Sequence, residues 1–339
     1  APSGHPWASW RNQRRPEILE LFKEHMYGAV PTDVNSSCRF EIMEEGKTLS
    51  GLGQRSQVRI FFGTDTDGPH VDVLIYVPVG AREDNPSPLF VGLNFMGNHT
   101  TTSENAVLIT DSWVRNDSGI GYIDHKASAK SRGVKAERWP VAMILEAGFG
   151  VATAYYGDID PDFDDGFKNG IHQLYPFNDG REGRQWGSIA TWAWGLSRIM
   201  DYLVTLPNVD GDRVAVLGHS RLGKTSLWAG AMDERFAVVI SNDSGCGGAA
   251  LSRRQFGETV KRINTSFPHW FSLNFRQYND RESELPLDQH MLIALMAPRP
   301  VYIASASEDL WADPRGEFLA GLHAQPVYGL YGLTGLRNE

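Results

Sequence analysis

The chain has 339 residues, of which 41% are hydrophobic and 22% charged, and a formal net charge of −9 at pH 7. This length allows one sizeable buried core. The acidic balance argues against nucleic acid as a partner, since phosphate recognition needs clustered Lys and Arg. We expect no membrane span, because the sequence contains no run of about 20 apolar residues. The two cysteines, Cys38 and Cys246, allow at most one disulfide and lack metal-ligand spacing.

The first 70 residues are expected to be irregular, apart from one helix over about Pro16–Met26 with a proline at an early helical position. Two strands are predicted next, at Val71–Val77 and Leu89–Phe95, with a Pro-rich turn between them. The polar stretch from Gly97 to Arg138 shows little periodicity. A loop of this length in a compact domain is usually functional.

Beyond this loop, helices and strands alternate regularly. Helices are predicted near Pro140–Ala147, Trp186–Leu206 and Leu222–Met232, and strands at Gly150–Tyr155, Arg213–Leu217, Phe236–Ser241 and Val301–Ala304. Near-continuous apolar runs in the strands are typical of a parallel sheet that helices cover on both faces. The sequence therefore predicts one α/β domain over residues 1–339, with a mainly parallel sheet between two helical layers.

One of these strands leads directly into a serine flanked by glycines. The segment Gly218-His219-Ser220-Arg221-Leu222-Gly223-Lys224 follows a buried strand, and a helix begins at once. This order is typical of a nucleophile elbow, whose turn lifts a serine hydroxyl above the sheet and aims helix N–H groups at an oxyanion. The second glycine comes one residue later than in Gly-x-Ser-x-Gly, so Leu222 occupies a place usually kept small. The alternative is an ordinary strand-to-helix turn with a capping serine.

The segment 218–224 resembles the signature of the glucuronoyl esterases, carbohydrate esterase family 15. Segments 92–100, 241–250, 267–271 and 309–314 also resemble that family, the last two its bacterial members. The resemblance implies an α/β-hydrolase fold. It implies hydrolysis of the ester between glucuronic acid, or 4-O-methylglucuronic acid, on xylan and alcohols of lignin, through an acyl-enzyme on Ser220. It implies neither a metal nor an organic cofactor.

The same resemblance assigns roles near Ser220. It implies that Arg221 supports the oxyanion, that Lys224 and Glu258 hold sugar hydroxyls, and that Trp311 lies against the sugar. Arg221 and Lys224 are three residues apart at the start of a helix, so both can reach one mouth of the site. Without the resemblance, Lys224 and Glu258 would be interpreted as solvated charges and Trp311 as a core aromatic residue.

The catalytic triad is incomplete in this sequence. In this fold the acid follows the serine and precedes the histidine. Asp309, after the strand at 301–304, is the predicted acid, and Asp243 is its rival, with a turn or capping role as the alternative. Only His323 follows Asp309, inside an expected helix. We expect the histidine to lie beyond Glu339, and the 339-residue chain alone to be a poor esterase, since losing a triad member costs orders of magnitude in rate.

Other functions remain open from the sequence. An acetyl xylan esterase or other carboxylic ester hydrolase is one, although a neutral acetyl group has no use for the cation pair Arg221 and Lys224. An inactive carbohydrate-binding homologue without a triad histidine is another, although the elbow is intact. An enzyme acting on a polymer meets it outside the cytoplasm, so a secreted or periplasmic protein is expected, as a monomer.

Two further features carry weaker hypotheses. The acidic run Asp158–Gly166 fails the EF-hand pattern and is interpreted as a solvated loop rather than a calcium site. His99, in the long loop, has two interpretations. It either reaches the active site or bonds its own loop as a structural histidine.

Overall fold

The computed structural model describes residues 5–31, 37–63, 67–175 and 183–336. The chain divides into two compact units. The serine unit comprises Ala1–Pro31, Phe177–Ala193 and Val216–Glu339, and the hairpin unit comprises Thr32–Pro176 and Trp194–Ala215. Helix α5 (Ser188–Leu203) and strand β6 (Val209–His219) each begin in one unit and end in the other. The single domain over residues 1–339 stays a prediction, because a compact unit need not fold alone.

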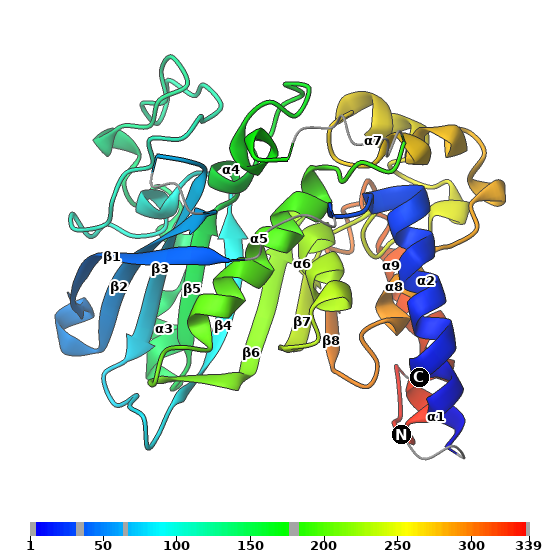
Figure 1. Ribbon diagram of the computed structural model, residues 1–339, viewed down its shortest axis with the longest axis horizontal. Coiled ribbons are helices and arrows are strands. Elements are labelled where there is room, and N and C mark those ends of the chain that lie inside the picture. Colours follow the sequence, from blue (N-terminus) through cyan, green and yellow to red (C-terminus); the bar gives the residue numbers. More distant parts are fainter. Residues whose placement is uncertain (1–4, 32–36, 64–66, 176–182, 337–339) are drawn as a thin grey trace. The chain divides into compact units, whose positions relative to one another are not determined.

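The hairpin unit is built on a mixed sheet (Figure 1). Its strands lie in the order β1 (Cys38–Thr48), β2 (Gly53–Phe62), β3 (His70–Pro78), β5 (Gly150–Tyr155) and β4 (Ser87–Asn94). The first three pairings are antiparallel, and β4 pairs with β5 in parallel. Helix α3 (Val141–Glu146) buries Val141 and Leu145 against β3 and β5, and α4 (Tyr156–Ile159) directly follows β5.

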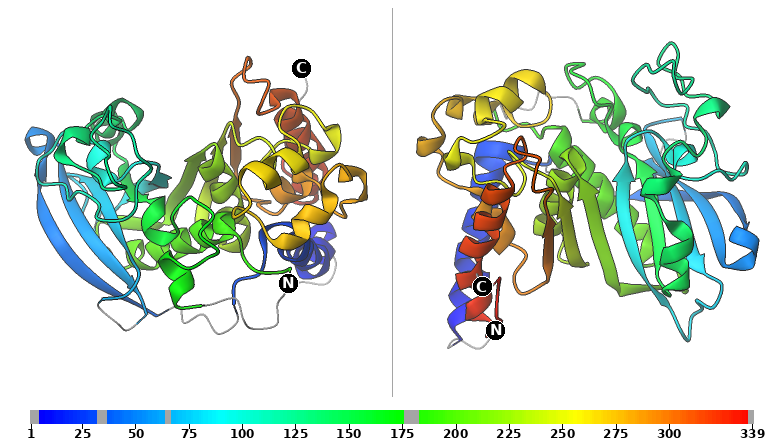
Figure 2. Two further views of the ribbon diagram at one scale, coloured as in Figure 1. Left: turned by 90° about the horizontal axis from the view of Figure 1, so that it is seen from above. Right: turned by 180° about the vertical axis from the view of Figure 1, so that it is seen from behind.

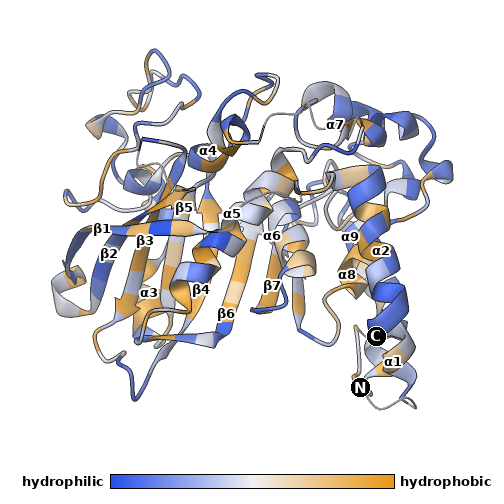
Figure 3. Cartoon of the chain, viewed as in Figure 1, coloured by the Kyte–Doolittle hydropathy of each residue, from blue (hydrophilic) through white to orange (hydrophobic). Residues whose placement is uncertain are grey.

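The prediction that residues 1–70 are irregular was wrong. Apart from the predicted helix, this region contains β1 and β2, which pair from Cys38↔Phe62 to Thr48↔Gly53. Strand β1 leaves most of its side chains exposed, including Ile42 at 57%. Figure 3 shows β1 and β2 as largely hydrophilic, in contrast to β4 and β6. Strand β1 therefore lacks the apolar pattern that identifies a strand, whereas β2 buries Val58, Ile60 and Phe62 at alternate positions.

The serine unit combines two parallel strands with the nucleophile helix. Strand β7 (Phe236–Asn242) pairs with β8 (Val301–Ala304) in parallel. Its helices are α1 (Pro6–Ser9), α2 (Arg15–Phe22), α6 (Arg221–Met232), α7 (Val260–Ser266), α8 (Gln289–Ala294) and α9 (Pro314–Leu330). Trp7 of α1 stacks on Tyr331 just after α9, with ring centroids 5.9 Å apart, so the first and last helices are in contact (Figure 2).

The predicted elements from Val71 to Ala304 are confirmed, although β6 begins at Val209 rather than Arg213. The predicted N-terminal helix corresponds to α2 and the helical turns that continue it to Tyr27. Residues 97–138 form the predicted long loop, with three short 3-10 turns. Within the part of the chain that the structure describes, no helix is long and apolar enough to cross a membrane.

His99 has a structural role in the long loop. Its ring is fully buried, and Nε2 lies 2.8 Å from the Ser131 hydroxyl oxygen, which joins the two ends of the loop. Burial lowers the pKa of His99 to about 4, because the charged form is desolvated. The ring is therefore neutral at physiological pH, as a structural histidine requires.

Arg55 of β2 links the hairpin to the long loop. Its guanidinium donates to both carboxylate oxygens of Glu44, at 2.6 and 2.9 Å, and to Glu104 at 2.8 Å. The Arg55 side chain is only 7% exposed. The hydrogen bond from Arg55 lowers the pKa of Glu44 below its ordinary value. This cluster therefore stabilises the fold most where Glu44 is ionised.

We expect Arg55→Ala to lower the free energy of unfolding by about 2–3 kcal/mol, because two carboxylates lose a buried cation. The pKa of Glu44 is lower in the folded state, so this contribution is present above the ordinary glutamate pKa of about 4.3 and is lost as the pH falls below it. Chemical denaturation at pH 7 and pH 3.5 measures both effects. Arg39→Ala, which removes an exposed pair with Glu41 on the same hairpin, is the matched control. Equal losses in the two variants would contradict the prediction.

Candidate active site

The turn between β6 and α6 places Ser220 directly before a helix. Ser220 has φ +56° and ψ −126°, a backbone conformation that L residues rarely adopt. Its N–H donates to the Asn242 carbonyl at 2.9 Å, and its carbonyl accepts from Gly223 and Lys224 at 2.8 and 3.1 Å. The hydroxyl is therefore held at a helix N-terminus, where the helix dipole favours negative charge.

The spacing of the glycines follows from close approaches in this turn. A Cβ at Gly218 would lie 1.9 Å from the Leu222 carbonyl oxygen, so no side chain fits there. A Cβ at Gly223 would lie 3.1 Å from the Ser241 hydroxyl, where α6 passes the end of β7. Leu222 itself points into the core, with 1% of its surface exposed. The predicted strand, turn and helix are confirmed, and the later glycine serves the contact with β7.

Ser220 lies in a polar pocket of about 180 Å³ within the serine unit. All six residues predicted to act in catalysis or substrate binding line it: Ser220, Arg221, Lys224, Glu258, Asp309 and Trp311. Its other lining residues are His219, Asp243, Ser244, Gly245, Phe267, Trp270 and Ala312. The structure thus brings together residues from the start of α6 and from the loops after β7 and β8.

Arg221 is held against two aromatic rings. Its guanidinium carbon lies 4.7 Å from the ring centroid of Trp270 and 5.5 Å from that of Phe267. The two rings stack on each other at 3.7 Å. Cation–π attraction therefore fixes the guanidinium beside Ser220. Sequence reasoning gave Phe267 and Trp270 no role, and the aromatic cluster at 267–271 is the signal that points to them.

Lys224 is a buried part of the pocket, not a solvated lysine. It is 3% exposed, and its Nζ donates to the Ser244 carbonyl at 2.5 Å. Burial lowers the pKa of Lys224, and the Glu258 carboxylate opposes this shift. Burial likewise raises the pKa of Glu258, opposed by Lys224. The pocket therefore contains a cation and an anion, each with incomplete solvation.

Trp311 is half-exposed, at 52%, and so is not a core aromatic residue. Its carbonyl accepts from the Glu258 N–H at 3.0 Å, which fixes these two lining residues relative to each other. The Arg262 guanidinium carbon lies 5.8 Å from the Trp311 ring centroid. A flat indole beside a carboxylate and an ammonium is an arrangement that suits a sugar ring. The individual roles of these residues stay predictions.

Both rival acids line the pocket. Asp309 is exposed, and its Oδ1 accepts from the N–H groups of Trp311 and Ala312 at 3.2 and 3.3 Å. Asp243 has φ +45°, and its Oδ1 accepts from the Ala306 N–H at 2.7 Å. Each carboxylate therefore holds a loop at the pocket, and the choice of Asp309 as triad acid stays a prediction.

No histidine downstream of Ser220 lines this pocket in the described ranges. His219 does line it, but its Nδ1 lies 2.9 Å from the side-chain nitrogen of Asn242. His323 is in α9, within the predicted helix, with its ring 6.2 Å from that of His290. The prediction that the triad histidine lies beyond Glu339 falls outside the described residues.

The acidic run Asp158–Gly166 is not the solvated loop that the sequence indicated, because Asp158, Asp160 and Asp162 are buried. Asp158 accepts hydrogen bonds from Thr110 and from the Asp72 N–H, and burial raises its pKa to about 7. Among the described residues, no group of three or more His, Cys, Asp or Glu side chains is placed to hold a metal ion.

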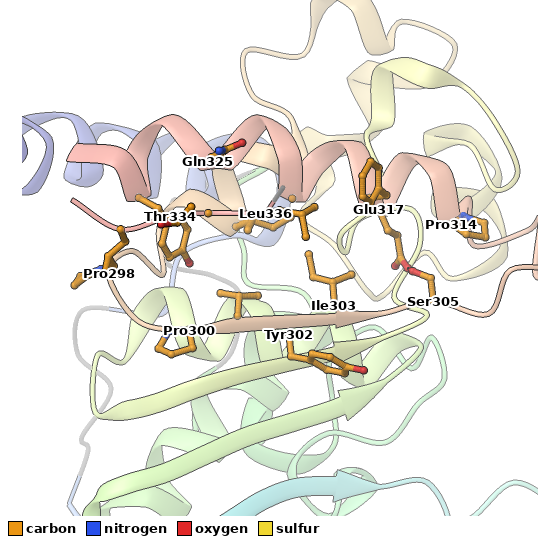
Figure 4. A pocket seen from close by; sticks show the side chains of 17 residues that line it. Pro298, Pro300, Tyr302, Ile303, Ser305, Pro314, Glu317, Gln325, Thr334 and Leu336 are labelled. Carbon is orange, nitrogen blue, oxygen red and sulfur yellow. The ribbon is translucent and has the colours of Figure 1, made fainter. Parts of the chain in front are cut away.

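A larger cavity, of about 640 Å³, lies between β8 and α9 (Figure 4). Its lining is mostly apolar, with Ile303 on β8 and Tyr328 on α9. It does not contain Ser220 or the cations beside it. The chemistry of the lining residues, rather than cavity volume, therefore identifies the candidate active site.

Comparisons with known proteins agree with this geometry. A family model described as "Glucuronyl esterase, fungi" matches residues 141–332. The chain is 55% identical to carbohydrate esterase MZ0003 of an unknown prokaryotic organism, over 96% of this chain and 75% of that protein. It is 32% identical to 4-O-methyl-glucuronoyl methylesterase 1 of Phanerochaete chrysosporium, over 59% of this chain and only 45% of that protein.

A solved structure confirms the fold class. It is described as a promiscuous CE15 esterase from a marine bacterial metagenome, and the likeness has a TM-score of 0.89 at 52% identity. It covers 98% of this chain and 83% of that one. The mixed, partly parallel sheet with helices is the predicted α/β-hydrolase fold, with an antiparallel hairpin that the sequence did not indicate.

We expect Gly218→Ala to lower the free energy of unfolding by about 1–3 kcal/mol, because its methyl group would collide with the backbone of Leu222. Thermal unfolding measures the loss. Gly329→Ala in α9, where an added Cβ meets nothing within 4 Å, is the matched control and should be neutral or stabilising. A Gly218→Ala variant as stable as the parent would contradict the predicted collision with the Leu222 backbone.

Proposed function

Since the chain belongs to the glucuronoyl esterase family, carbohydrate esterase family 15, we propose that it is a serine esterase acting on esters of glucuronic or 4-O-methylglucuronic acid. The observation that carries this proposal is the pocket in which Ser220 begins a helix beside Arg221, Lys224 and Glu258. The name of the fungal relative, a 4-O-methyl-glucuronoyl methylesterase, supports the choice of substrate.

In the proposed mechanism, the Ser220 Oγ attacks the ester carbonyl and forms a tetrahedral intermediate. Arg221, held against Trp270, and the N-terminus of α6 stabilise the oxyanion. Collapse of the intermediate releases the alcohol and leaves glucuronate bound to Ser220 as an ester. Water then attacks this acyl-enzyme and releases the uronic acid. The proton that Ser220 loses needs a general base, which in this fold is a histidine.

The placement of charge fits a uronate ester. The esterified carboxyl group is neutral, so negative charge develops only at the oxyanion and on the released acid. Arg221 can therefore favour the transition state over the bound substrate. Lys224 and Glu258 offer a donor and an acceptor to sugar hydroxyls, and the half-exposed Trp311 offers an apolar face to the ring.

Glucuronic acid branches on xylan, esterified to lignin alcohols, are the proposed natural substrate. Such a polymer lies outside the cytoplasm, so we propose that the protein acts as a secreted or periplasmic enzyme. We propose that it does so as a monomer, because all six predicted site residues line one pocket of a single chain.

A carboxylic ester hydrolase of broader range is the second candidate. It is favoured by the solved structure at 52% identity, which is described as promiscuous. Arg221 would serve the oxyanion of any ester. Lys224, Glu258 and Trp311, in contrast, contribute only if the acyl group is a sugar acid. Rates on a uronate ester and on a simple acetate ester therefore separate the two candidates.

We expect a form of the protein that includes the predicted triad histidine to release benzyl alcohol from benzyl D-glucuronate, and Ser220→Ala in that form to lower the rate by at least about 10³-fold. Ser266→Ala, at an exposed position at the end of α7, is the matched control and should keep the parent rate. A p-nitrophenyl acetate assay run in parallel tests the broader candidate. Release that persists in Ser220→Ala would rule out Ser220 as the nucleophile. If the form with the predicted histidine is inactive and its Ser220→Ala variant also fails to bind methyl glucuronate, the proposed substrate is ruled out.

The triad acid can be identified by two amide variants. We expect Asp309→Asn to lower kcat by about 10³–10⁴-fold with little change in KM, as removal of a triad acid does. Asp243→Asn keeps its loop contact to Ala306 and should lower kcat by less than about tenfold. Steady-state kinetics on benzyl glucuronate, with the form of the protein that includes the predicted histidine, measures both. The opposite order would assign the acid to Asp243.

A further inference from the structure

Glu317 is a buried carboxylate to which the proposed chemistry gives no role. It lies near the start of α9 and has no exposed surface, and burial raises its pKa above the ordinary value. Figure 4 shows the side chains of Glu317 and Ser305 pointing toward each other at one end of the cavity beside β8. A buried carboxylate persists only where hydrogen-bond donors compensate its lost hydration. Its partners therefore reveal what it holds in place.

Two of its partners, Ser244 and Gly245, belong to the loop after β7, which forms one wall of the active-site pocket. Glu317 Oε1 accepts from the Gly245 N–H at 2.8 Å and from the Ser244 hydroxyl at 3.1 Å, while Oε2 accepts from the Ser305 hydroxyl. The N-terminus of α9 is capped separately, by Asp313. The Glu317 side chain therefore serves the loop after β7 rather than its own helix.

The same loop holds the buried lysine of the pocket. The Ser244 carbonyl accepts from Lys224 Nζ at 2.5 Å, and the Ser244 hydroxyl accepts from the Ala249 N–H at 2.8 Å. Glu317 and Lys224 thus bind the same residue from two sides. Any shift of Ser244 moves the acceptor that fixes the Lys224 ammonium.

We propose that Glu317 is a positioning residue of the active site, which fixes Ser244 and Gly245 so that the Ser244 carbonyl holds the Lys224 ammonium in the pocket. This inference rests on the proposed function, in which Lys224 binds the sugar. A carboxylate suits the position because the Ser244 hydroxyl and the Gly245 N–H are both donors. Without Glu317, both groups would be buried donors with no acceptor. The loop would then shift so that they reach other acceptors.

Three variants separate the position of the acceptor from its charge. Glu317→Ala removes the acceptor, and Glu317→Asp keeps the charge but withdraws it by one methylene group. Glu317→Gln keeps an acceptor oxygen for Gly245 and Ser244 without the charge, so it should rescue the function. Glu282→Ala is the matched control, because Glu282 is also buried, bonds Gln255, and does not line the pocket.

The first readout needs no substrate. Lys224 is buried, so acetic anhydride should acetylate it slowly, as followed by peptide mass spectrometry. We expect Glu317→Ala and Glu317→Asp to speed this labelling by about tenfold or more. This factor corresponds to the free energy of one lost hydrogen bond to a charged group. Glu317→Gln and Glu282→Ala should stay within about threefold of the parent.

The second readout is affinity for methyl D-glucuronate, measured by calorimetry in the Ser220→Ala background. Glu317→Ala and Glu317→Asp should raise Kd by about tenfold, and Lys224→Met should raise it at least as much. Because Glu317 acts through Lys224, the double variant of Glu317→Asp and Lys224→Met should bind no worse than Lys224→Met alone. Multiplying effects would instead show that Glu317 acts through overall stability.

The outcomes distinguish the two proposals. If Glu317→Ala fails to fold, Glu317→Asp, which keeps the negative charge, tests the same expected changes in labelling and affinity. Unchanged labelling of Lys224 in Glu317→Asp, or equal effects in Glu282→Ala, would overturn the positioning role. If the parent binds no methyl glucuronate, the proposed function fails, while the labelling of Lys224 still decides whether Glu317 positions it.

Discussion

The tight start of α6 is the constraint on which the active site depends. Because residue 218 has no side chain, the carbonyl of Leu222 can lie directly above it, and the helix begins without an intervening loop. Ser220, Arg221 and Lys224 therefore occupy a single turn, and a hydroxyl and two cations enter the same pocket. The aromatic stack and the Ser244 loop then hold those cations, so the rest of the site is arranged around this turn.

Most of the fold was predictable because its strands are buried on both faces. In Gly150–Tyr155, for example, every residue is buried, and the apolar composition alone predicts the strand. Strand β1 could not be found this way, since its exposed edge position puts no pattern of apolar residues into the sequence. The division of the chain at α5 and β6 was equally hidden, because it depends on contacts between distant segments.

The site was predicted in proportion to how local its residues are. Ser220 follows from a strand, a turn and a helix in the right order, and Asp309 from its place after a strand. Lys224, Glu258 and Trp311, in contrast, needed the family resemblance. Trp270 was missed because only the folded chain places its ring beside a residue 49 positions earlier, Arg221. Long-range pairings of this kind leave no spacing for sequence reasoning to detect.

The backbone conformation of Ser220 bears on its proposed catalytic role. Its φ of +56° is strained for any L residue with a side chain, by about 1–3 kcal/mol, and is easy for glycine. A chain selected for stability alone would therefore carry glycine at this position. A serine at this position costs stability, and this is the compromise expected if its hydroxyl group has the catalytic role proposed above.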